Sequence, residues 1–592
     1  MALYALSFLY LTLSVMFLGL FASTRVSQNI NSRRKTKMNV TMMIVVVLSS
    51  IVQEIVFLNK KVMINALEKS PHFRLHVVVA LNICLIHFCS MLELLVIVSL
   101  LALMGAILGI ICGLVPGLHQ NNVAILLVLF FPLYMELMSK ITDPDTAFYG
   151  FISMFIAAMC THNFSDVIGA MLTGVPDASE TFTLQPAQRL LMKGAGMQVV
   201  HSSVIGSFLG IMFGLALLLP VKMILTEPLG MYEKIKPLVP VVLACVCALI
   251  VLSEKGKKYV RGKKFLVFST TPDAENTVLK AVKGKVVWLS DDGRRGIIVR
   301  RKYRIKFELK ERFQVKKGDD VCFYGLFIDD VHESHVAGYA LAFFVFLLSG
   351  ILGWTVLFTP VAHLTAFTLL FPLFTGLFGV AGLSINLTKP GYVPEQKEVV
   401  STKTGIERRI LPGAFIGMLI GIFPGITPGC GAVMVGTKDT RPEQYITLTS
   451  AIEASAFVFN IGALFIIQKT RSGAIATLEQ VCGISEKWLN FDAFSPVLAL
   501  CLFSIALATL CALVLIPAIG LRLLRRAHLF TNRFLQVVIL SGMVFSVFLV
   551  TGVIGLVVMG VATLVGIIPI VLGLRRIHLM GSILLPVTII LL

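Results

Sequence analysis

The sequence predicts an all-α membrane protein that crosses the bilayer many times and carries one small β-rich soluble insert. Of the 592 residues, 57% are hydrophobic and 14% are charged, whereas soluble domains carry about 25% charged residues. Apolar runs long enough to cross the roughly 30 Å hydrocarbon core as helices also recur along the chain. They lie at 3–22, 40–58, 92–115, 197–220, 236–252, 336–358, 494–518 and 533–550.

One segment, 253–335, does not fit the membrane. It contains 20 basic and 12 acidic residues, and short β-rich runs alternate with the turn signals "DDG" and "KKGDD". This pattern predicts a small antiparallel barrel or sheet of about five strands, of the OB or SH3-like kind. The predicted domains are an N-terminal hydrophobic extension at 1–90, a first membrane repeat at 91–252, the soluble insert at 253–335, and a second membrane repeat with C-terminal helices at 336–592.

The extension at 1–90 is interpreted as either a poorly packed addition or an over-long gene model, because Met91 is a natural start for the first regular helix. The net charge of +19 is concentrated in short connections, as at 25–37, 525–533 and Arg575–Arg576. Such clusters mark cytoplasmic loops and attract anionic membrane lipid. We therefore expect a multi-pass cell-membrane protein with the insert in the cytoplasm.

Several functions are not indicated by the sequence. No HExxH or GxSxG motif and no paired catalytic acids occur, so we predict that the protein is not an enzyme and has no cofactor. The 11 cysteines show no ligand spacing, so no metal site is expected. Nucleic acid is not expected as a partner either. The insert offers few aromatic residues for base stacking, which are Tyr303, Phe307, Phe313 and Phe323.

An internal repeat is the most informative pattern. Residues 105–117, "GAILGIICGLVPG", and residues 413–425, "GAFIGMLIGIFPG", carry Gly, Ala, Gly, Gly, Pro and Gly at matching positions 308 residues apart. A weaker echo relates "FSDVIGAML" at 164–172 to "FVFNIGALF" at 457–465. These matches predict two related membrane halves separated by the insert.

Each copy of the repeat combines two features. Glycines four residues apart lie on one helix face and allow a second backbone to approach closely, which explains Gly105, Gly109 and Gly113. The Pro-Gly pair that follows breaks the helix, and unwound backbone at membrane depth is tolerated only where protein buries it or where it lines a wet cavity. Broken helices in matching positions of two repeats point to a transport site.

We therefore predict a substrate site where the two breaks face each other near the membrane midplane. Backbone N–H groups, helix dipole ends and uncharged side chains would bind an anion there. The candidate substrate-binding residues are Gly113, Pro116, Gly117, Asn121, Asn122, Gly421, Pro424, Gly425, Thr427 and Gly429.

Several other polar residues near apolar runs have two readings. Asp166 and Glu453 are either coupling groups for Na⁺ or H⁺ or exposed groups at loop edges. His119 and His162 are either loop residues or ligands. Arg471, with Lys469, either offsets a substrate carboxylate or marks a helix end.

Three motifs resemble the large membrane subunit of tripartite tricarboxylate transporters, the TctA family. They are "GLVPGLHQNNVAILLVLFFPL" at 113–133, the segment at 169–210 that begins "GAMLTGVPDASETF", and the second-half copy at 413–436. The segments at 460–476 and 573–587 look more like archaeal relatives with a soluble insert. The resemblance covers about residues 91–592.

The resemblance implies a symport permease for citrate-like di- or tricarboxylates, working by alternating access. It also implies an extracytoplasmic binding protein and a small membrane subunit, although a stand-alone permease fits equally well. The family's Pro-Gly-Thr-Pro loop corresponds here to a second candidate loop, in which we include Gly174, Pro176, Asp177 and Ser179. The competing hypothesis is a non-transporting membrane scaffold or sensor that works through the β insert.

Overall fold

A computed structural model describes most of the chain from residue 71 onward, and the predicted runs at 3–22 and 40–58 lie outside it. Its contacts divide the chain into a helical unit, Met1–Ile250 with Val345–Leu592, and an insert unit, Val251–Phe344. Within 71–592, the residues not described are 116–117, 176–182, 228, 270–279, 301–302, 311–313, 359–365, 389–391, 399–406, 424–427, 436–440, 485 and 489–494.

The part of the helical unit before the insert is a series of helices with one bent pair. Helices α4 and α5 meet at an angle of 50°. The elements are α3 (Pro71–Gly113), α4 (Gln120–Leu129), α5 (Phe131–Met138), α6 (Pro144–Thr173), α7 (Leu184–Leu191), α8 (Gly196–Leu225), α9 (Met231–Ile235), the 3₁₀ turn η1 (Lys236–Leu238) and α10 (Val239–Leu252).

The part after the insert contains a π-helical segment, η2, in the middle of a longer helix. The elements are α11 (His335–Phe358), α12 (Ala366–Phe374), η2 (Thr375–Val380), α13 (Ala381–Thr388), α14 (Glu407–Ile422), α15 (Pro428–Met434), α16 (Pro442–Ile467), α17 (Gly473–Cys482), α18 (Pro496–Leu524), η3 (Ala527–Thr531), α19 (Arg533–Leu572), η4 (Arg576–Met580) and α20 (Gly581–Leu591).

Nine helices in the described part are long and apolar enough to cross a membrane, and α4 with α5 would make a tenth if the bent pair is one span. This supports the prediction of a mostly helical, multi-pass membrane protein. Three of the nine lie outside the apolar runs given above, namely α6, α16 and the Thr368–Thr388 span of α12, η2 and α13. The most apolar 18-residue windows of α6 and α16 are 100% and 89% buried, so protein surrounds their polar side chains.

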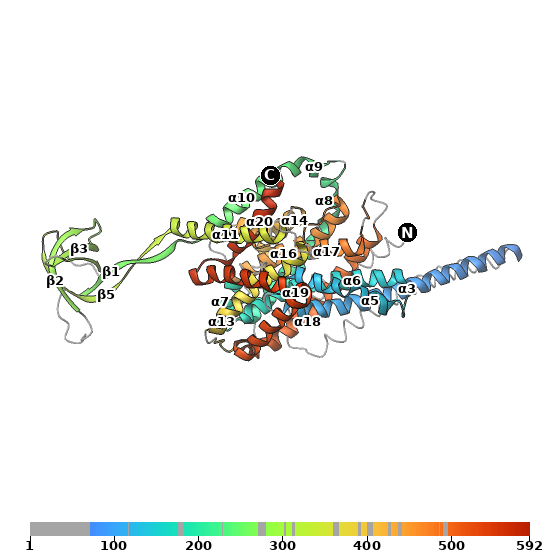
Figure 1. The fold of residues 1–592 in the computed structure, drawn as a ribbon, viewed down its shortest axis with the longest axis horizontal. Helices are drawn as coiled ribbons and strands as arrows, with labels where there is room; N and C mark the ends of the chain where they lie inside the picture. Colours follow the sequence, from blue (N-terminus) through green and yellow to red (C-terminus); the bar gives the residue numbers. More distant parts are fainter. Residues whose placement is uncertain are drawn as a thin grey trace. The chain divides into compact units, whose positions relative to one another are not determined.

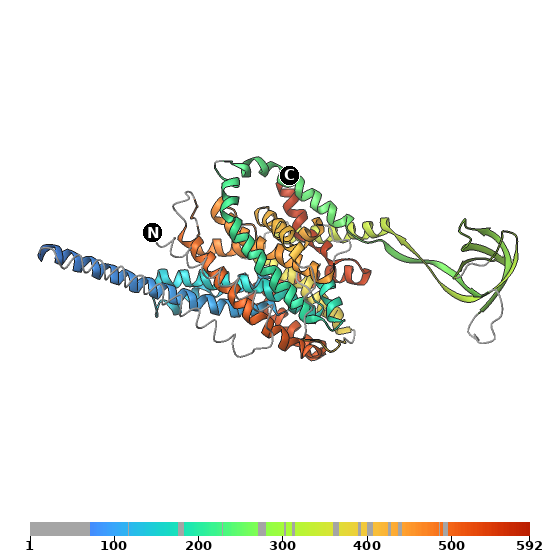
Figure 2. The same cartoon turned by 180° about the vertical axis from the view of Figure 1, so that it is seen from behind.

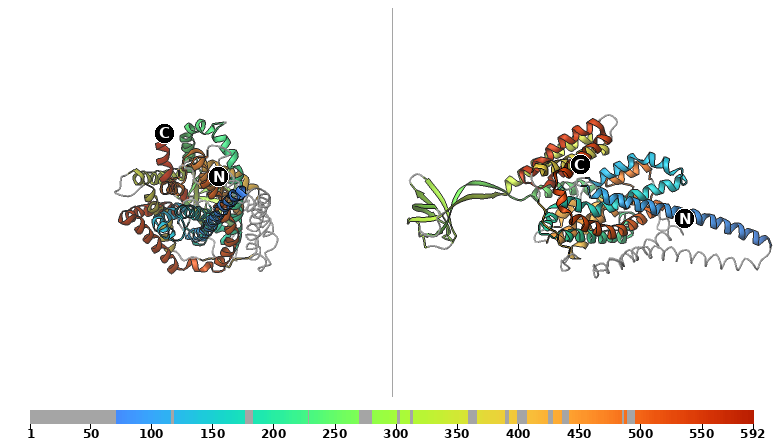
Figure 3. Two further views of the ribbon diagram at one scale, coloured as in Figure 1. Left: turned by 90° about the vertical axis from the view of Figure 1, so that its right-hand side faces the viewer. Right: turned by 90° about the horizontal axis from the view of Figure 1, so that it is seen from below.

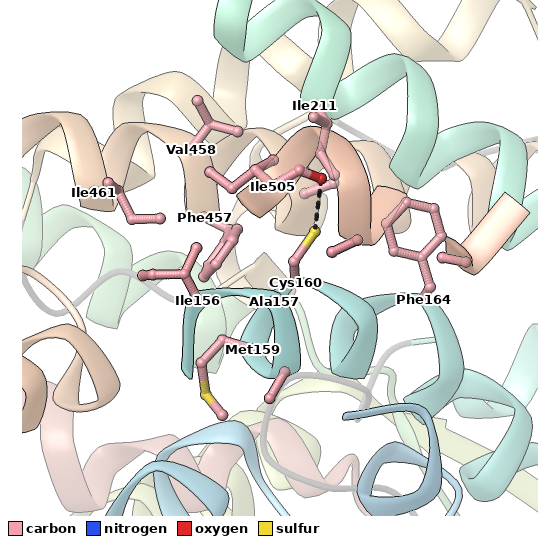
Figure 4. Packing of buried hydrophobic residues seen from close by; sticks show 14 of the residues in the cluster. Ile156, Ala157, Met159, Cys160, Phe164, Ile211, Phe457, Val458, Ile461 and Ile505 are labelled. Atoms are coloured by element: carbon pink, nitrogen blue, oxygen red, sulfur yellow. Dashed lines mark hydrogen bonds between the residues drawn. The ribbon is translucent and has the colours of Figure 1, made fainter. Parts of the chain in front are cut away.

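The helical core is built from closely packed pairs of helices. Helix α3 lies along α6, and both are seen side by side in Figure 1 and Figure 2. Helix α14 lies along α16 in the same way. The pairs are joined by contacts of α6 with α18 and of α8 with α16. Figure 4 shows Cys160 and Phe164 of α6 among Ile211 of α8, Val458 of α16 and Ile505 of α18.

Two helices differ from their predicted limits. Helix α3 begins at Pro71, so the expected helix start at Met91 falls inside it. Helix α19 continues to Leu572, well beyond the predicted run at 533–550, and it is kinked at Gly552, whose φ is 62° and ψ −154°. Because glycine lacks a Cβ, it adopts this conformation at little cost.

The insert unit contains a closed five-stranded barrel with the strand order β1-β4-β3-β2-β5. This confirms a β-rich insert, but the antiparallel prediction is wrong for β1 and β4, which pair in parallel. The strands are β1 (Lys257–Ser269), β2 (Lys280–Leu289), β3 (Arg295–Arg300), β4 (Tyr303–Leu309) and β5 (Asp320–Ser334).

Strands β1 and β5 are longer than the barrel requires. They pair from Lys257 with Ser334 to Ser269 with Tyr324, whereas β4 pairs only with the 265–267 part of β1. The first part of β1 and the last part of β5 therefore form a two-stranded ribbon, which the right-hand view of Figure 3 shows in green.

The barrel interior contains two of the four aromatic residues that were named as candidates for base stacking. Phe307 and Phe323 are 2% and 0% exposed, and their ring centroids are 4.8 Å apart inside the barrel core. They are core residues and do not offer surfaces on which a base could stack. Phe313 and the side chain of Tyr303 lie outside the described part.

Candidate functional site

The repeated glycines bring two pairs of helices into close contact. A Cβ added at Gly105, Gly109 or Gly113 of α3 would meet, in turn, the backbone carbonyl oxygens of Met154, Ala158 and His162 in α6. This explains why each of the three positions lacks a side chain, since any larger residue would push the helices apart. The packing interpretation of the glycines is correct for this helix.

The second set of glycines makes the same contacts in the other half. A Cβ at Gly413, Gly417 or Gly421 of α14 would meet the carbonyl oxygens of Leu448, Ile452 and Ala456 in α16. The α16 carbonyl residues lie 294 positions after their α6 counterparts in all three cases. At Gly113 and Gly421, two candidate substrate-binding residues, the missing side chain thus faces a neighbouring helix.

A matching hydrogen bond accompanies each set of glycines. The Thr161 hydroxyl of α6 donates to the carbonyl oxygen of Ala106 at 2.8 Å. The Ser455 hydroxyl of α16 donates to the carbonyl oxygen of Ala414 at 2.9 Å. Each bond joins the two helices directly beside the glycine contacts, where backbones are close enough for a short hydroxyl side chain to reach across.

Two buried polar contacts join the N-terminal helices to the C-terminal helices. The hydroxyls of Ser153 in α6 and Ser504 in α18 are 2.6 Å apart. Where α8 contacts α16, the Thr447 hydroxyl of α16 donates to the Ser202 carbonyl of α8 at 3.3 Å. Small residues line the second contact, because a Cβ on Gly206 would lie 2.5 Å from the Thr447 carbonyl oxygen.

The first helix break is described from Leu118 onward. Helix α4 begins with His119 as its N-cap, whose Nδ1 accepts a 3.1 Å hydrogen bond from the Asn121 backbone N–H. The Asn121 side-chain oxygen accepts a 2.9 Å hydrogen bond from the Ala474 N–H, in the first turn of α17. The N-terminus of α4, from the N-terminal half of the chain, and the N-terminus of α17, from the C-terminal half, therefore meet at Asn121.

Asn122 points to a different helix. Its side-chain Nδ2 donates to the Thr375 hydroxyl at 3.3 Å, and Thr375 is the first residue of the π-helical segment η2. Both residues are almost fully buried, and the Oδ1 atom of Asn122 has no hydrogen-bond partner in the described part of the chain. π-Helical turns interrupt regular hydrogen bonding and often occur at functional sites.

His162 and Asp166 lie one turn apart inside α6, 1% and 6% exposed. The loop alternatives for both residues are therefore wrong. The Nε2 atom of His162 is 2.9 Å from the Leu118 carbonyl oxygen, and its Nδ1 atom is 4.0 Å from Asp166 Oδ2. Because Leu118 directly follows Pro116–Gly117, His162 lies between the backbone after the first break and Asp166.

Glu453 is also buried inside a helix, α16, with 5% exposure, so its loop-edge alternative is wrong too. Between α16 and α17, Arg471 donates a 2.8 Å hydrogen bond from Nη2 to the Tyr232 hydroxyl. Its guanidinium carbon is 5.8 Å from the centre of that ring. Tyr232, in α9, therefore fixes the orientation of Arg471.

The second loop follows the end of α6. Gly174, with φ 73°, is the left-handed C-cap of α6, and the Asn386 side chain of α13 donates a 2.7 Å hydrogen bond to the Thr173 carbonyl. Val175 is fully buried beneath α12, α13 and α19. A polar side chain from a distant helix thus satisfies a carbonyl at the C-terminus of α6.

The structure leaves part of the predicted site untested. Gly429 lies in the short helix α15. The predicted meeting of the two Pro-Gly breaks, and the second-loop prediction for Pro176, Asp177 and Ser179, fall outside the described residues. Sequence reasoning missed Thr375 and Asn386, since a single threonine or asparagine in an apolar run carries no pattern. The candidate residues outside the described part are Pro116, Gly117, Pro176, Asp177, Ser179, Pro424, Gly425 and Thr427.

The nine membrane-length helices of the described part and the helix ends that meet at Asn121 indicate a multi-pass membrane protein with interrupted helices. The chain matches the tripartite tricarboxylate transporter TctA family over residues 100–281 and 323–581. The protein belongs to this family. Membership confirms the resemblance drawn from the three motifs, and it confirms that the protein is of a transporter class and not an enzyme.

An archaeal relative is also similar to part of the chain. An uncharacterized protein of Methanocaldococcus jannaschii is 30% identical over 149 residues, which is 24% of this chain and 34% of that protein. The aligned part thus spans about a third of the relative's length. No solved structure matches the chain.

Proposed function

We propose that this protein is a secondary transporter for small organic anions, specifically di- and tricarboxylates, that moves its substrate by alternating access. The observation that carries the proposal is the meeting of α4 and α17 at Asn121. A helix N-terminus presents free N–H groups and partial positive charge. Two such ends at one interrupted helix make a site suited to a carboxylate.

Asn121 is the residue best placed to bind the substrate directly. Its side-chain oxygen accepts the hydrogen bond from the Ala474 N–H. Its Nδ2 group is the donor that it would offer to an anion. Asn122 instead bonds to Thr375, so its proposed role is to couple the break to η2. The remaining break residues, Pro116 and Gly117, would end the half-helix and let the ligand approach backbone amides.

We propose that the two halves are related repeats and that the second break, Pro424, Gly425, Thr427 and Gly429, faces the first. The matching glycine contacts at 154, 158 and 162 and at 448, 452 and 456 support this relationship. The hydroxyl bonds from Thr161 and Ser455 support it as well. Two related halves can exchange conformations, which would give the outward-facing and inward-facing states of alternating access similar packing.

Asp166 and Glu453 are the proposed coupling groups for Na⁺ or H⁺. A buried carboxylate inside a membrane helix is costly unless a cation or a proton compensates it. Asp166 is connected through His162 to the backbone at the first break. Occupancy of Asp166 by a cation or a proton would therefore bias the geometry of the substrate site.

Further parts of the proposal concern location and partners. The charge bias of the short loops favours a cytoplasmic insert. The family name denotes a tripartite system, so a small membrane subunit and an extracytoplasmic binding protein are the proposed partners. Membrane lipid surrounds the helical unit in this proposal.

The experiment that tests the proposal is substrate uptake by the purified protein in proteoliposomes. We expect uptake of radiolabelled citrate or succinate driven by a Na⁺ or H⁺ gradient, with empty liposomes as the control. An Asn121→Asp variant should be inactive while inserting normally. A wild-type protein that takes up none of these anions under any gradient would favour the scaffold or sensor alternative.

A further inference from the structure

Arg576, at the start of η4, is a cation with a buried nitrogen atom that no acceptor compensates in the described part of the chain. Its Nη1 atom is buried and has no hydrogen-bond partner in the described part of the chain. Two other cations in the described part of the helical unit have aromatic or hydroxyl partners. Lys222 lies 4.5 Å from the centre of the Trp488 ring, and Arg471 is bonded to Tyr232. Burial of a guanidinium is expensive unless an anion or several acceptors compensate it.

Uncharged residues lie beside the Arg576 guanidinium, and one of them is a glycine, Gly382, whose missing side chain leaves room for it. A Cβ added at Gly382 of α13 would lie 3.0 Å from Nη1 of Arg576 and 3.0 Å from Cγ1 of Val175. Arg576, Gly382 and Val175 therefore meet at one place. Within the described residues, no carboxylate forms an ion pair with Arg576.

This place adjoins the loop that follows α6. Val175 is the residue after Gly174, the C-cap of α6. The Asn386 amide of α13 donates a 2.7 Å hydrogen bond to the Thr173 carbonyl in the same region. The fold thus brings a positive charge from η4 close to Val175, directly after the C-cap of α6.

Resting on the proposed function, we infer that Arg576 binds a carboxylate group of the transported anion. A guanidinium presents a rigid fork of donors that matches the two oxygens of a carboxylate. Arg576 would supply one charged contact, and the uncharged donors at Asn121 would serve another part of the transport cycle or another carboxylate. The lipid phosphate group offers similar chemistry, so the test must separate the two.

The test measures citrate binding to detergent-purified full-length protein by the shift in its melting temperature. Arg576→Gln should weaken binding about tenfold or more. Arg533→Gln, at an exposed arginine at the start of α19, should bind like the wild type. Arg576→Lys should restore part of the affinity, because it keeps the charge but not the fork.

A second variant leaves the charge intact. Gly382→Ala places a methyl group beside Nη1 of Arg576, so it should weaken citrate binding about threefold or more while the protein remains monodisperse. The lipid source is separated by repeating the measurement in nanodiscs of phosphatidylcholine alone and with phosphatidylglycerol. Stabilisation of the wild type by phosphatidylglycerol but not by citrate, lost in Arg576→Gln, would assign the residue to lipid and overturn the inference.

The inference and the proposed function fail in different ways. Binding of citrate that depends on Arg576, without uptake into liposomes, keeps the carboxylate-binding role of Arg576 and overturns transport. Uptake and binding that are unchanged in Arg576→Gln keep transport and overturn the inference. A wild type that neither binds nor takes up di- or tricarboxylates overturns both.

Discussion

Asn121 and Ala474 are 353 positions apart in the chain, yet the Asn121 side-chain oxygen accepts a 2.9 Å hydrogen bond from the Ala474 N–H. The bond places the first turn of α4 against the first turn of α17. Asn121 thus lies in the first turn of α4 and also accepts a hydrogen bond from a backbone N–H in the first turn of α17. This one contact joins the N-terminal and C-terminal halves at the proposed substrate site.

The first prediction separates a structural from a functional role of Asn121. Asn121→Ala removes the acceptor for Ala474 and should cost about 1 kcal/mol of stability, as loss of a helix cap does. Asn121→Asp keeps an acceptor but adds negative charge where an anion is proposed to bind. We expect Asn121→Asp to be the more stable variant but to have the lower uptake. Equal uptake by Asn121→Asp and wild type would show that the role is structural.

The second prediction concerns the glycine contacts. Gly109→Ala and Gly417→Ala would each place a Cβ against a carbonyl oxygen of the neighbouring helix, and such overpacking costs about 1–3 kcal/mol. Gly560→Ala in α19 is the matched control, because no atom lies within 4 Å of its Cβ position. Melting temperatures in detergent should fall for the first two variants only. A fall of similar size for Gly560→Ala would attribute the loss to something other than close packing.

The third prediction concerns coupling. Asp166→Asn should abolish gradient-driven uptake but retain exchange of internal for external substrate, which needs no net ion movement. The substitution should fold, because the second half has an asparagine, Asn460, at the equivalent position 294 residues later. The backbone nitrogen of Asp166 lies 3.2 Å from a Cβ placed on Gly113, and that of Asn460 lies 3.1 Å from a Cβ placed on Gly421. Glu453→Gln is tested in the same assay. If both variants concentrate substrate like the wild type, the coupling ion binds elsewhere.

The fourth prediction is a pH dependence of the barrel. A hydrogen bond from Lys264, with the nearby charge of Arg295, holds the pKa of Glu308 below its ordinary value, against the opposing effect of burial. Since the folded-state pKa is depressed, the stabilisation is present above the unfolded pKa of about 4.3 and is lost as pH falls through the folded value. The barrel should therefore loosen below about pH 4.

Hydrogen exchange of β3 and β4 peptides, corrected for the intrinsic effect of pH, measures this loosening. Glu308→Gln should lower protection at pH 7, by about 1 kcal/mol or less because the pair is partly exposed, and should flatten the fall in protection at low pH. Asp291→Asn, at an exposed turn residue, serves as the control. A wild-type barrel with constant protection from pH 7 to 3 would contradict the prediction.

The fifth prediction concerns topology. A cysteine introduced at Asp291, in the turn between β2 and β3, should resist a membrane-impermeant maleimide in intact cells and react after the membrane is opened. The reason is the excess of basic residues in the short loops on the same predicted side. Labelling of intact cells would place the insert outside.

The sequence by itself determined the class of the protein. Hydrophobic length predicted most of the membrane helices because crossing about 30 Å of hydrocarbon needs about 20 apolar residues whatever their neighbours. Glycines at a spacing of four predicted the close packing of α3 and α14 because this spacing places them on one helix face. The three motifs indicated the TctA family, which the family match confirms.

Only the tertiary structure decided which residues meet. Helices α6 and α16 are surrounded by protein, so they can carry polar residues that the hydropathy rule, which identified most of the other spans, does not allow for. The contacts of Asn121 with Ala474, Asn122 with Thr375, and Arg576 with the space at Gly382 join residues far apart in the chain. Local pattern cannot predict such contacts, because they depend on how the helices cross, and crossing is set by the packing of all the helices together.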